Sequence, residues 1–281
     1  MFRRKKQLLF SLFVLVIGYF VLGTFFQFGT SSEEIEEADD LSIMTYNVRG
    51  FNRYEVINSP TVFEDIKQLI DDEKPSIICF QEFGSLKRNS FTQYKYKYVK
   101  YIRMQHKVIM GFYSKYPIVS EGLVNFPNSA NNGAYIDVLY KRDTVRVYNL
   151  HMESLKIRPN RTALSNEESG KLYKRIAKSF EKQQEQAAIF RKHKEAVSYK
   201  IIVCSDLNNT QFSNVYKVVK GDMRDSFMEK GAGYGRTYNF RYFPLRIDFI
   251  FADPEFQIIS HKNYDANLSD HFPVMTTLRL L

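Results

Sequence analysis

From Leu41 to the C-terminus, short apolar runs alternate with amphipathic stretches, and this order limits the fold more than any other feature. LSIMTYNV and SIICFQ have the composition of buried strands. Between them, Ser59-Pro60 supplies an N-cap followed by proline at the first helical position, and Lys74-Pro75 ends the helical pattern. Residues 42–81 therefore predict a β-α-β unit.

The remainder of the chain adds more strands than helices. Helical patterns cover residues 165–197 and 212–219. The strand-like runs are short, rich in aromatic or β-branched residues and separated by turn residues: KYKYVKY, KVIMGFYS, AYIDVLY, TVRVYNL, KIIVCSD, RIDFIFA and PVMTTLRL. Helices interspersed among many strands predict an α/β sandwich with mixed sheets. Since no repeat or second linker interrupts the pattern, we expect one domain over residues 41–281.

The first residues differ in kind from this domain. After a basic tail over residues 1–6, the run from Leu8 to Phe28 contains no charge, a length that suits a helix crossing a bilayer. A cleavable signal peptide is the alternative, but its apolar region is usually about 7–15 residues long. We therefore predict a transmembrane signal-anchor over residues 7–28. The positive-inside bias keeps the basic tail in the cytoplasm and places residues 41–281 on the extracytoplasmic side of the membrane.

Charge is unevenly distributed along the chain. The formal net charge is +9, but residues 1–40 hold four basic and six acidic side chains, so residues 41–281 carry +11. Residues 29–40 are acidic and lack hydrophobic periodicity, which predicts a flexible tether. A basic domain favours polyanions such as nucleic acid, anionic headgroups or phosphorylated metabolites, although a merely basic surface explains the charge equally well.

The two cysteines, Cys79 and Cys204, cannot form a disulfide framework. Each lies in an apolar run that predicts a buried strand. Cys79 lies three residues before Glu82, and Cys204 two before Asp206. If both carboxylates point into one site, the alternation of side chains along a strand sends the two thiols to opposite faces. We expect two buried, unreactive thiols.

Polar and acidic residues gather where the predicted strands end. Asp and Asn after a strand usually form turns, and a lone His is more often structural than catalytic. An Asp inside an apolar run such as RIDFIF needs another explanation, because an unpaired buried carboxylate is costly. Six such strand ends favour one shared site, whose members are Asn47, Glu82, His151, Asp206, Asn208, Asp248, Asp270 and His271.

Taken in order, the motifs TYNVRGF, FQEF, YNLHMES, SDLNNT, RIDFIF and SDHFPV resemble those of the endonuclease/exonuclease/phosphatase superfamily, the deoxyribonuclease I-like proteins, and in particular its membrane-anchored bacterial members. The motifs extend from residue 43 to residue 275. The resemblance implies a four-layered α/β sandwich with two mixed β-sheets flanked by helices. It also implies a Mg²⁺-dependent hydrolase, with Mn²⁺ as an alternative ion, in which water attacks the phosphorus of a phosphoester.

The resemblance further assigns roles to the acidic and amide side chains. Glu82 is the expected principal metal ligand, with Asn47 and Asp270 as additional metal or phosphate contacts. Asp206 is expected to orient or deprotonate the attacking water, and Asn208 to position that water or the phosphate. Mg²⁺ prefers oxygen ligands and keeps several waters, so one or two carboxylates suffice.

The resemblance also gives roles to two histidines. His271, held by Asp248, would stabilise charge in the transition state or protonate the leaving group. His151 would donate a hydrogen bond to a phosphoryl oxygen. A carboxylate partner fixes the tautomer of a histidine and stabilises its charged form. The chain has too few Cys and closely spaced His residues for a structural zinc site, and it lacks the GxSxG motif of a serine hydrolase.

The chain departs from the family pattern at three places. Ser205 stands where a glycine is often found before the catalytic Asp, and Asn209 replaces a frequent Asp. Neither change removes an expected ligand. The arginine that deoxyribonuclease-like members direct at the scissile phosphate cannot be placed in this sequence, where the corresponding region reads NNGAYIDV. This third departure weakens the case for a deoxyribonuclease more than the case for hydrolysis.

Two substrate classes remain open, and we favour nucleic acid. The +11 domain and the basic, Tyr-rich residues 88–107 favour a nuclease, although an amphipathic strand pair with solvated lysines also explains that segment. The predicted anchor favours a phospholipid or inositol-phosphate phosphoesterase instead. A third alternative is a non-catalytic module that binds phosphate or nucleic acid, but the chain retains the Glu, the Asp-x-Asn and the Asp-His pair. Nothing in the sequence indicates an obligate oligomer.

Overall fold

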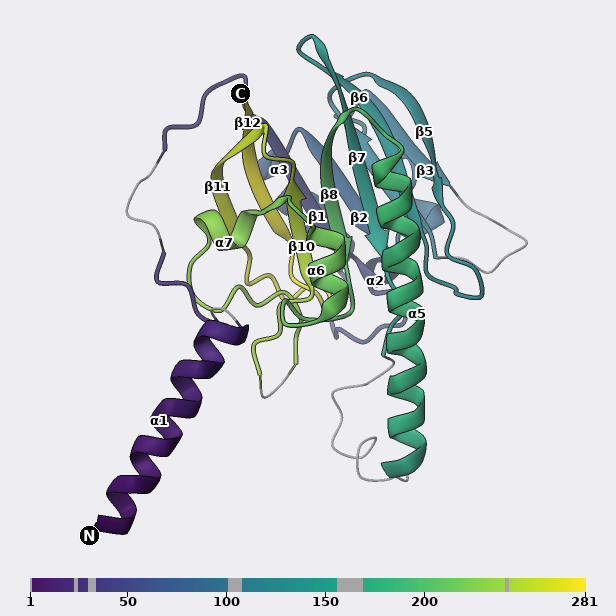
Figure 1. Cartoon of the computed structure of the whole chain (residues 1–281). Helices are drawn as coiled ribbons and strands as arrows, with labels where there is room; N and C mark the ends of the chain where they lie inside the picture. The colour runs from purple at the N-terminus through teal and green to yellow at the C-terminus, as the bar shows by residue number, and fades with distance from the viewer. Residues whose placement is uncertain (1, 23–24, 30–33, 101–107, 156–168, 241–242) are drawn as a thin grey trace.

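The computed structural model describes residues 2–22, 25–29, 34–100, 108–155, 169–240 and 243–281. Within these ranges the strands form two six-stranded sheets that face each other (Figure 1). The first sheet has the order β11 (Phe256–Asn263), β12 (Val274–Leu280), β1 (Leu41–Asn47), β2 (Ile77–Gln81), β4 (Met110–Ser114), β3 (Tyr96–Lys100). The second has the order β5 (Ile118–Val124), β6 (Gly133–Tyr140), β7 (Asp143–His151), β8 (Lys200–Asp206), β10 (Asp248–Ala252), β9 (Arg224–Asp225).

Helices cover the outer faces of the two sheets. The described helices are α1 (Phe2–Leu22), α2 (Arg49–Asn52), α3 (Val62–Glu73), the 3₁₀ turn η1 (Ser85–Lys87), α5 (Ser169–Glu195), α6 (Asn214–Lys220) and α7 (Ser226–Lys230). One apolar core fills the space between the sheets. A second core lies between α3 and the first sheet, and a third between the second sheet and helices α5 and α6. Each core needs a helix or sheet on both sides, which explains the layered arrangement.

Each sheet contains one parallel pair among antiparallel neighbours. In the first sheet β1 runs parallel to β2, and in the second β7 runs parallel to β8. The expectation of two mixed sheets flanked by helices is therefore confirmed. Because the carboxyl ends of both parallel pairs point to the same end of the molecule, the loops that follow these four strands lie together (Figure 1).

A buried polar network joins the two sheets just beneath that end. The side-chain amide of Gln81 on β2 donates to Thr45 on β1 at 2.9 Å and to Asn149 on β7 at 2.7 Å. Asn149 in turn donates to the carbonyl of Phe80 at 2.9 Å. Amide groups this deeply buried are stable only when they are paired, so the network favours one alignment of the two sheets.

The secondary structure follows the sequence closely, with shifts at the helix starts. The helix expected after Ser59-Pro60 begins at Val62, because Ser59 bonds to Thr61 and does not cap the helix. Its end is as predicted, with Lys74 in the left-handed conformation. The helices predicted over 165–197 and 212–219 span 169–195 and 214–220 in the described residues. Strands β5, β9 and β11 were not predicted.

The prediction that the two thiols point to opposite faces is wrong. Cys79 and Cys204 both lie in the core between the sheets, where they are buried and free. Burial and the neighbouring thiol of Cys204 raise the pKa of Cys79. The side-chain alternation fails because Glu82 follows β2 in the left-handed region, with φ +48°.

Of the run predicted as a membrane anchor, residues 7–28, the structure describes residues 7–22 and 25–28. Among the described residues, none of the helices has both the length and the apolar character needed to cross a bilayer. Helix α1 includes the charged residues near the N-terminus, and its described part ends at Leu22. Farther along, Gln27 pairs with Gly233, and Phe25 packs against Tyr234 at a ring distance of 5.2 Å. Phe25 and Gln27, which belong to the predicted span, thus contact residues 233–234 of the domain.

Within the predicted tether, the described residues 34–40 make side-chain contacts with the domain. Glu34 pairs with Lys230 at 2.7 Å, and Asp40 pairs with Arg279 at 2.8 Å. Glu36 accepts a hydrogen bond from Thr277 on β12 at 3.0 Å. The acidic residues of 34–40 thus bind the basic and polar side chains around the edge of the first sheet. Parts of four predicted segments lie outside the described residues: 23–24 of the anchor, 30–33 of the tether, 101–107 of the basic segment, and 165–168 of the helix.

Candidate active site

The eight predicted site residues lie together at the carboxyl ends of the two parallel strand pairs. Asn47 and Gln81 are register partners at the end of the first sheet, and His151 and Asp206 at the end of the second. Crevices at this end of parallel strands are common ligand sites, because the loops there are free to carry function. The structure thus brings together residues that lie up to 224 positions apart, between Asn47 and His271.

Asn47 connects the acidic groups of the two sheets. Its side-chain NH₂ donates to Asp206 at 2.9 Å and to Glu82 at 3.3 Å. Its side-chain oxygen accepts from the backbone N–H of Arg49 at 3.1 Å, and the hydroxyl of Ser269 donates to its backbone carbonyl at 2.9 Å. Asn47 is therefore held from both sides, and in this arrangement it orients the two carboxylates.

Asp206 lies at the centre of the cluster and is fully buried. One carboxylate oxygen accepts from the backbone N–H of Asn208 at 2.9 Å. The other lies 3.5 Å from Nε2 of His151 and 3.7 Å from Nε2 of His271. Asn208, at φ +50°, donates its side-chain amide to the carbonyl of Met152 at 3.0 Å. A buried carboxylate surrounded by these donors stays fixed in orientation.

The second sheet also places Asp248 opposite Asp206, since the two are register partners on β10 and β8. Two carboxylates side by side repel each other, and a positive charge between them removes that penalty. His271 supplies it: Nδ1 lies 3.0 Å from Asp248, on the side of the ring opposite to Asp206. The three residues form a buried acid–imidazolium–acid row.

The pKa values follow from this arrangement. Burial alone would lower the pKa of His271, but the negative charges of Asp248 and Asp206 raise it to about 10. Burial raises the pKa of Asp248 to about 6, although the neighbouring His271 lowers it. At neutral pH the imidazole of His271 is therefore protonated and Asp248 is largely ionised.

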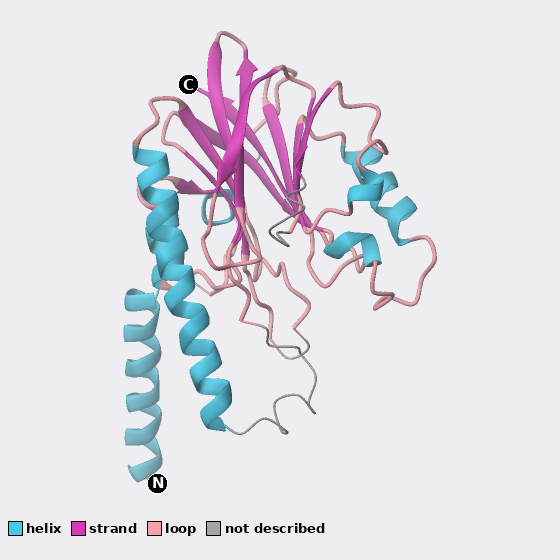
Figure 2. Cartoon of the chain, turned by 90° about the vertical axis from the view of Figure 1, so that its right-hand side faces the viewer, coloured by secondary structure: helices cyan, strands magenta, loops and turns pink. Residues whose placement is uncertain are grey.

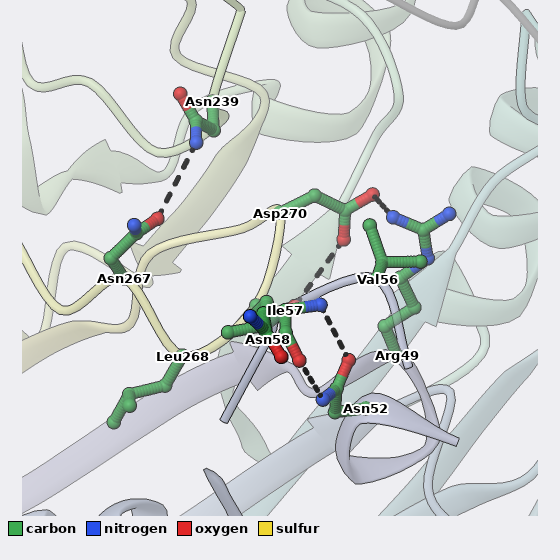
Figure 3. Close-up of a pocket in the computed structure, with 10 residues that line it drawn as sticks. Arg49, Asn52, Val56, Ile57, Asn58, Asn239, Asn267, Leu268 and Asp270 are labelled. Atoms are coloured by element: carbon green, nitrogen blue, oxygen red, sulfur yellow. Dashed lines mark hydrogen bonds and ion pairs between the residues drawn. The ribbon is translucent and has the colours of Figure 1, made fainter. Parts of the chain in front are cut away.

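Arg49 and Asp270 form an ion pair that the sequence did not predict. Figure 3 shows the two side chains pointing toward each other, and the guanidinium lies 2.6 Å from the carboxylate. Arg49 has φ +43° and is followed by Gly50 at φ +65°, so α2 opens with left-handed residues. Such strain persists where the surroundings enforce it, often at functional sites. Here the backbone N–H of Gly50 donates to the carbonyl of Glu82 at 2.7 Å.

Two hollows flank the acidic cluster. One, of about 320 Å³, is lined by Arg49 and Asp270 together with several asparagines, including Asn239 and Asn267, which bond to each other at 3.5 Å (Figure 3). The other, of about 180 Å³, contains Asn208 and is lined further by Ser154, Leu155, Asn209, Thr210, Tyr238, Phe240, Leu245 and Ile247. One hollow is thus rich in amides, whereas the other has largely apolar and aromatic walls.

The oxygen-rich donors fit a hard divalent cation such as Mg²⁺. The carboxylate of Glu82 is partly exposed. Among the described residues, it accepts one long hydrogen bond, from the side-chain NH₂ of Asn47 at 3.3 Å. Ligand atoms of Asp206, Asp248 and His271 also lie within 4.8 Å of one another. A cation there would meet a protonated imidazole, so the partly exposed carboxylate of Glu82 fits the ion better. Asp270 is already paired with Arg49, which competes with its predicted role as a metal ligand.

Four residues around the site were missed from the sequence, namely Arg49, Thr237, Tyr238 and Ser269. Thr237 accepts from the backbone N–H groups of Ile247 at 2.9 Å and Asp248 at 3.0 Å. Ser269 accepts from the backbone N–H of His271 at 3.4 Å. Ser269 lies within the motif SDHFPV and Arg49 within TYNVRGF, so the motifs could have marked both as residues near the site. Thr237 and Tyr238 lie in a segment without any motif.

Comparison with known proteins agrees with this geometry. A model of the Endonuclease/Exonuclease/phosphatase family matches residues 44–271. None of the curated protein sequences matches the chain significantly. Similar solved structures include humanized D. rerio TDP2, at TM-score 0.66 and 15% identity over 86% of this chain and 100% of that one. The human Nocturnin catalytic domain with bound sulfate has TM-score 0.65 and 12% identity over 86% and 94% of the two chains.

A third similar structure is the mannosyl-6-phosphatase Bt3783 of Bacteroides thetaiotaomicron. It has TM-score 0.62 and 16% identity, over 85% of this chain and 100% of that one. At these identities the structures establish a shared fold, while the match of the family model to most of the chain establishes the relationship. The chain therefore belongs to the endonuclease/exonuclease/phosphatase family, whose members hydrolyse phosphoester bonds.

Proposed function

We propose that the protein is a divalent-metal-dependent phosphodiesterase that cleaves nucleic acid by attack of water on phosphorus. The observation that carries the proposal is the position of Asp206, between an amide that links it to Glu82 and an imidazolium held by Asp248. Hydrolysis of a phosphoester requires a general base, a carboxylate that binds the metal, and a positively charged hydrogen-bond donor around one point.

In this proposal the buried residues handle protons and charge. Asp206 accepts a proton from the attacking water, and Asn208 holds the carboxylate and the water in place. His271, protonated at neutral pH, donates to a phosphoryl oxygen or to the leaving group, and Asp248 keeps the imidazole charged and oriented. His151, whose Nε2 faces Glu82 and Asp206, donates to a phosphoryl oxygen.

Glu82 would hold the cation, with Asn47 beside it. When bound there, Mg²⁺ or Mn²⁺ would offset charge on the phosphoryl oxygens and stabilise the leaving oxygen. Glu82 is suited to this role because it follows β2 in a left-handed conformation that turns it out of the core and into the site. The binding of the cation at a partly exposed residue also allows exchange with solvent.

The two hollows support a diester substrate. A phosphomonoester has a single organic substituent, whereas a diester has two, which must leave the phosphorus in different directions. The hollow beside Asp270 and the hollow beside Asn208 provide space for two such groups. We infer that one organic substituent of the diester binds in the amide-rich hollow and the other binds in the apolar hollow.

Helix α5 supports nucleic acid as the substrate. Its first half projects beyond the ends of the sheets, on the side of the molecule where α2 lies (Figures 1 and 2). Residues 169–180 contain four basic and no acidic side chains. Arg175 within this half donates to the carbonyl of Leu155, which lines the apolar hollow. A polyanion extending from the site would therefore pass a row of cations, whose contribution depends on salt.

The first experiment tests hydrolysis itself. We expect the full-length protein to cleave bis-p-nitrophenyl phosphate with Mg²⁺ or Mn²⁺ and to lose this activity in Glu82→Ala and His271→Ala. Asp222→Ala, which changes an exposed acidic residue, serves as the matched control. Turnover that persists in a chelator, or full activity in both site variants, would contradict the mechanism.

The second experiment tests the substrate class. Single-stranded and double-stranded DNA, RNA, sphingomyelin and phosphoinositides are compared at equal phosphoester concentration. We expect the nucleic acids to be cleaved faster than the lipids, with a rate that falls as salt increases. Faster cleavage of a lipid headgroup would replace nucleic acid as the substrate, and binding without cleavage in every case would identify a non-catalytic module.

A further inference from the structure

Tyr238 is a chemically active side chain in the site that the mechanism above does not use. It lines the apolar hollow together with Asn208. Its ring meets the imidazole of His271 edge to face, with 4.9 Å between the ring centres. Among the described residues, its hydroxyl has no hydrogen-bond partner. A phenol that is half-buried beside a catalytic histidine and remains unpaired can still donate a hydrogen bond to a ligand.

The backbone holds Tyr238 rigidly. Residues 237–239 pair with residues 270–272: the N–H of Asn239 donates to the carbonyl of Asp270 at 2.8 Å, and the N–H of Phe272 donates to the carbonyl of Thr237 at 2.7 Å. On its other side, the N–H of Tyr238 donates to the carbonyl of Leu245 at 3.1 Å. A donor held in this way needs no rearrangement when the substrate binds, which is the condition under which a hydrogen bond contributes most to catalysis.

Burial and the charged residues of the site keep the phenol of Tyr238 protonated. Burial, followed by the charge of Asp270, raises the pKa of Tyr238 to about 12, so the phenol keeps its proton at neutral pH. The same hydroxyl also interacts electrostatically with Arg49, Asp206 and Glu82. Tyr238 therefore lies beside His271, at the wall of the apolar hollow, close to where the phosphate is expected.

We propose that the hydroxyl of Tyr238 donates a hydrogen bond to a non-bridging oxygen of the scissile phosphate. This assignment rests on the proposed function. The hydroxyl of Tyr238 supplies a neutral hydrogen-bond donor on the side of the apolar hollow. His271 supplies a charged hydrogen-bond donor from the buried row. Because the hydroxyl serves an oxygen that stays on phosphorus, it assists the reaction whatever alcohol leaves, and no proton is transferred.

The kinetic test compares Tyr238→Phe with Tyr234→Phe, using bis-p-nitrophenyl phosphate and diesters with poorer leaving groups. Tyr238→Phe keeps the ring on His271 and removes only the hydroxyl. We expect kcat/KM to fall by on the order of 10²-fold, to the same extent for every leaving group. Tyr234 is exposed and contacts Phe26 at a ring distance of 5.0 Å, so its variant should match the wild type. An unchanged Tyr238→Phe, or a loss that grows as the leaving group becomes poorer, would overturn the assignment.

A binding test separates this inference from the proposed function. In the presence of Mg²⁺, the affinity for inorganic phosphate is measured by calorimetry for the wild type, Tyr238→Phe and Tyr234→Phe. A hydrogen bond to a charged group predicts a roughly tenfold loss in Tyr238→Phe alone. If the wild type cleaves no diester, the proposed function fails, yet this measurement still decides the role of Tyr238. The assignment of Tyr238 would be contradicted by equal phosphate affinity in the three proteins, or by an altered unfolding temperature in Tyr238→Phe.

Discussion

The candidate site has two halves that differ in burial and in the way their charges are balanced. In the buried half, the side chains of Asp206, Asp248 and His271 are at most 6% exposed. In the open half, those of Glu82, Asp270 and Arg49 are 34%, 26% and 31% exposed. In the first half the imidazolium of His271 is enclosed between two carboxylates, whereas the charges in the second half can exchange partners with ions or substrate. The comparison suggests that the buried half performs the proton chemistry and the open half admits metal and phosphate.

The difference has a structural origin. Strand pairing sets the buried half, because the register of β8 and β10 places Asp206 beside Asp248 inside a sheet. Loops set the open half, because Glu82 and Arg49 follow strands in left-handed conformations. Groups on regular strands are held more precisely than groups on loops, which suits the residues that must not move during the reaction.

The largest effect is expected in the buried half, at Asp206. Asp206→Asn keeps the shape of the side chain and removes the base, so kcat should fall by about 10²- to 10⁴-fold. Additional Mg²⁺ should not restore it, because the missing function is proton transfer. Initial rates on bis-p-nitrophenyl phosphate over a metal titration measure this, with Asp222→Asn as the control. Restoration by metal would show that Asp206 is instead a metal ligand and would remove the distinction between the halves.

Glu82→Gln tests the open half and should behave in the opposite way. The variant loses the charge that holds the cation, so activity at low metal should fall by roughly 10²-fold, a part of the several kcal/mol that a metal contributes. Raising the metal concentration should restore much of kcat. The comparison requires the midpoint of the metal titration for the wild type and for the exposed control Glu255→Gln. A midpoint that stays at the wild-type value would exclude Glu82 as the ligand.

Asp248→Asn tests the charge balance of the buried half. A carboxylate that supports a catalytic group is typically worth about 10- to 100-fold in activity. The variant should also alter stability with pH. Because the pKa of His271 in the folded protein, about 10, lies above its ordinary value of 6.5, the protonated ring contributes stability that is complete below about pH 6.5 and is lost as the pH rises through about 10.

Without the negative charge of Asp248, the pKa of His271 falls, so this loss of stability should occur at lower pH in the variant. Asp248 itself has a pKa of about 6 and does not titrate in that range, whereas Asp206 and Asp270 still face the ring. Urea unfolding at a series of pH values measures the free energy of unfolding for both proteins. Parallel curves above neutral pH would show that Asp248 does not hold the proton on His271.

The sequence predicted the buried half better than the open half. Asp206, Asp248 and His271 follow or begin apolar runs, so a strand pattern and a polar residue at its end sufficed to mark them. The ion pair between Arg49 and Asp270 joins residues separated by 221 positions, and no local pattern reports such a contact. Tyr238 was missed for a related reason, since the chain has 19 tyrosines and only the three-dimensional position distinguishes this one.

The same limit applies at the N-terminus. The acidic residues of 34–40 look like a solvated tether when their partners are unknown, yet Lys230 and Arg279 bind Glu34 and Asp40. Contacts such as that of Phe25 with Tyr234 are likewise not visible in a one-dimensional pattern. The helices and strands depend on local patterns and were predicted well, whereas long-range contacts were not.

The smallest effect is expected at Arg49, and it tests whether the halves are independent. The pair with Asp270 is partly exposed, so its loss should cost about 1 kcal/mol of free energy, which corresponds to about fivefold in binding affinity. Arg49→Gln should raise KM for an anionic diester by that amount and leave kcat nearly unchanged, because the buried row does not contact Arg49 directly. Arg53→Gln, an exposed arginine four residues along, is the matched control. If kcat in Arg49→Gln fell as far as in Asp248→Asn, the ion pair would be holding His271 through the neighbouring Asp270, and the two halves would act as one unit.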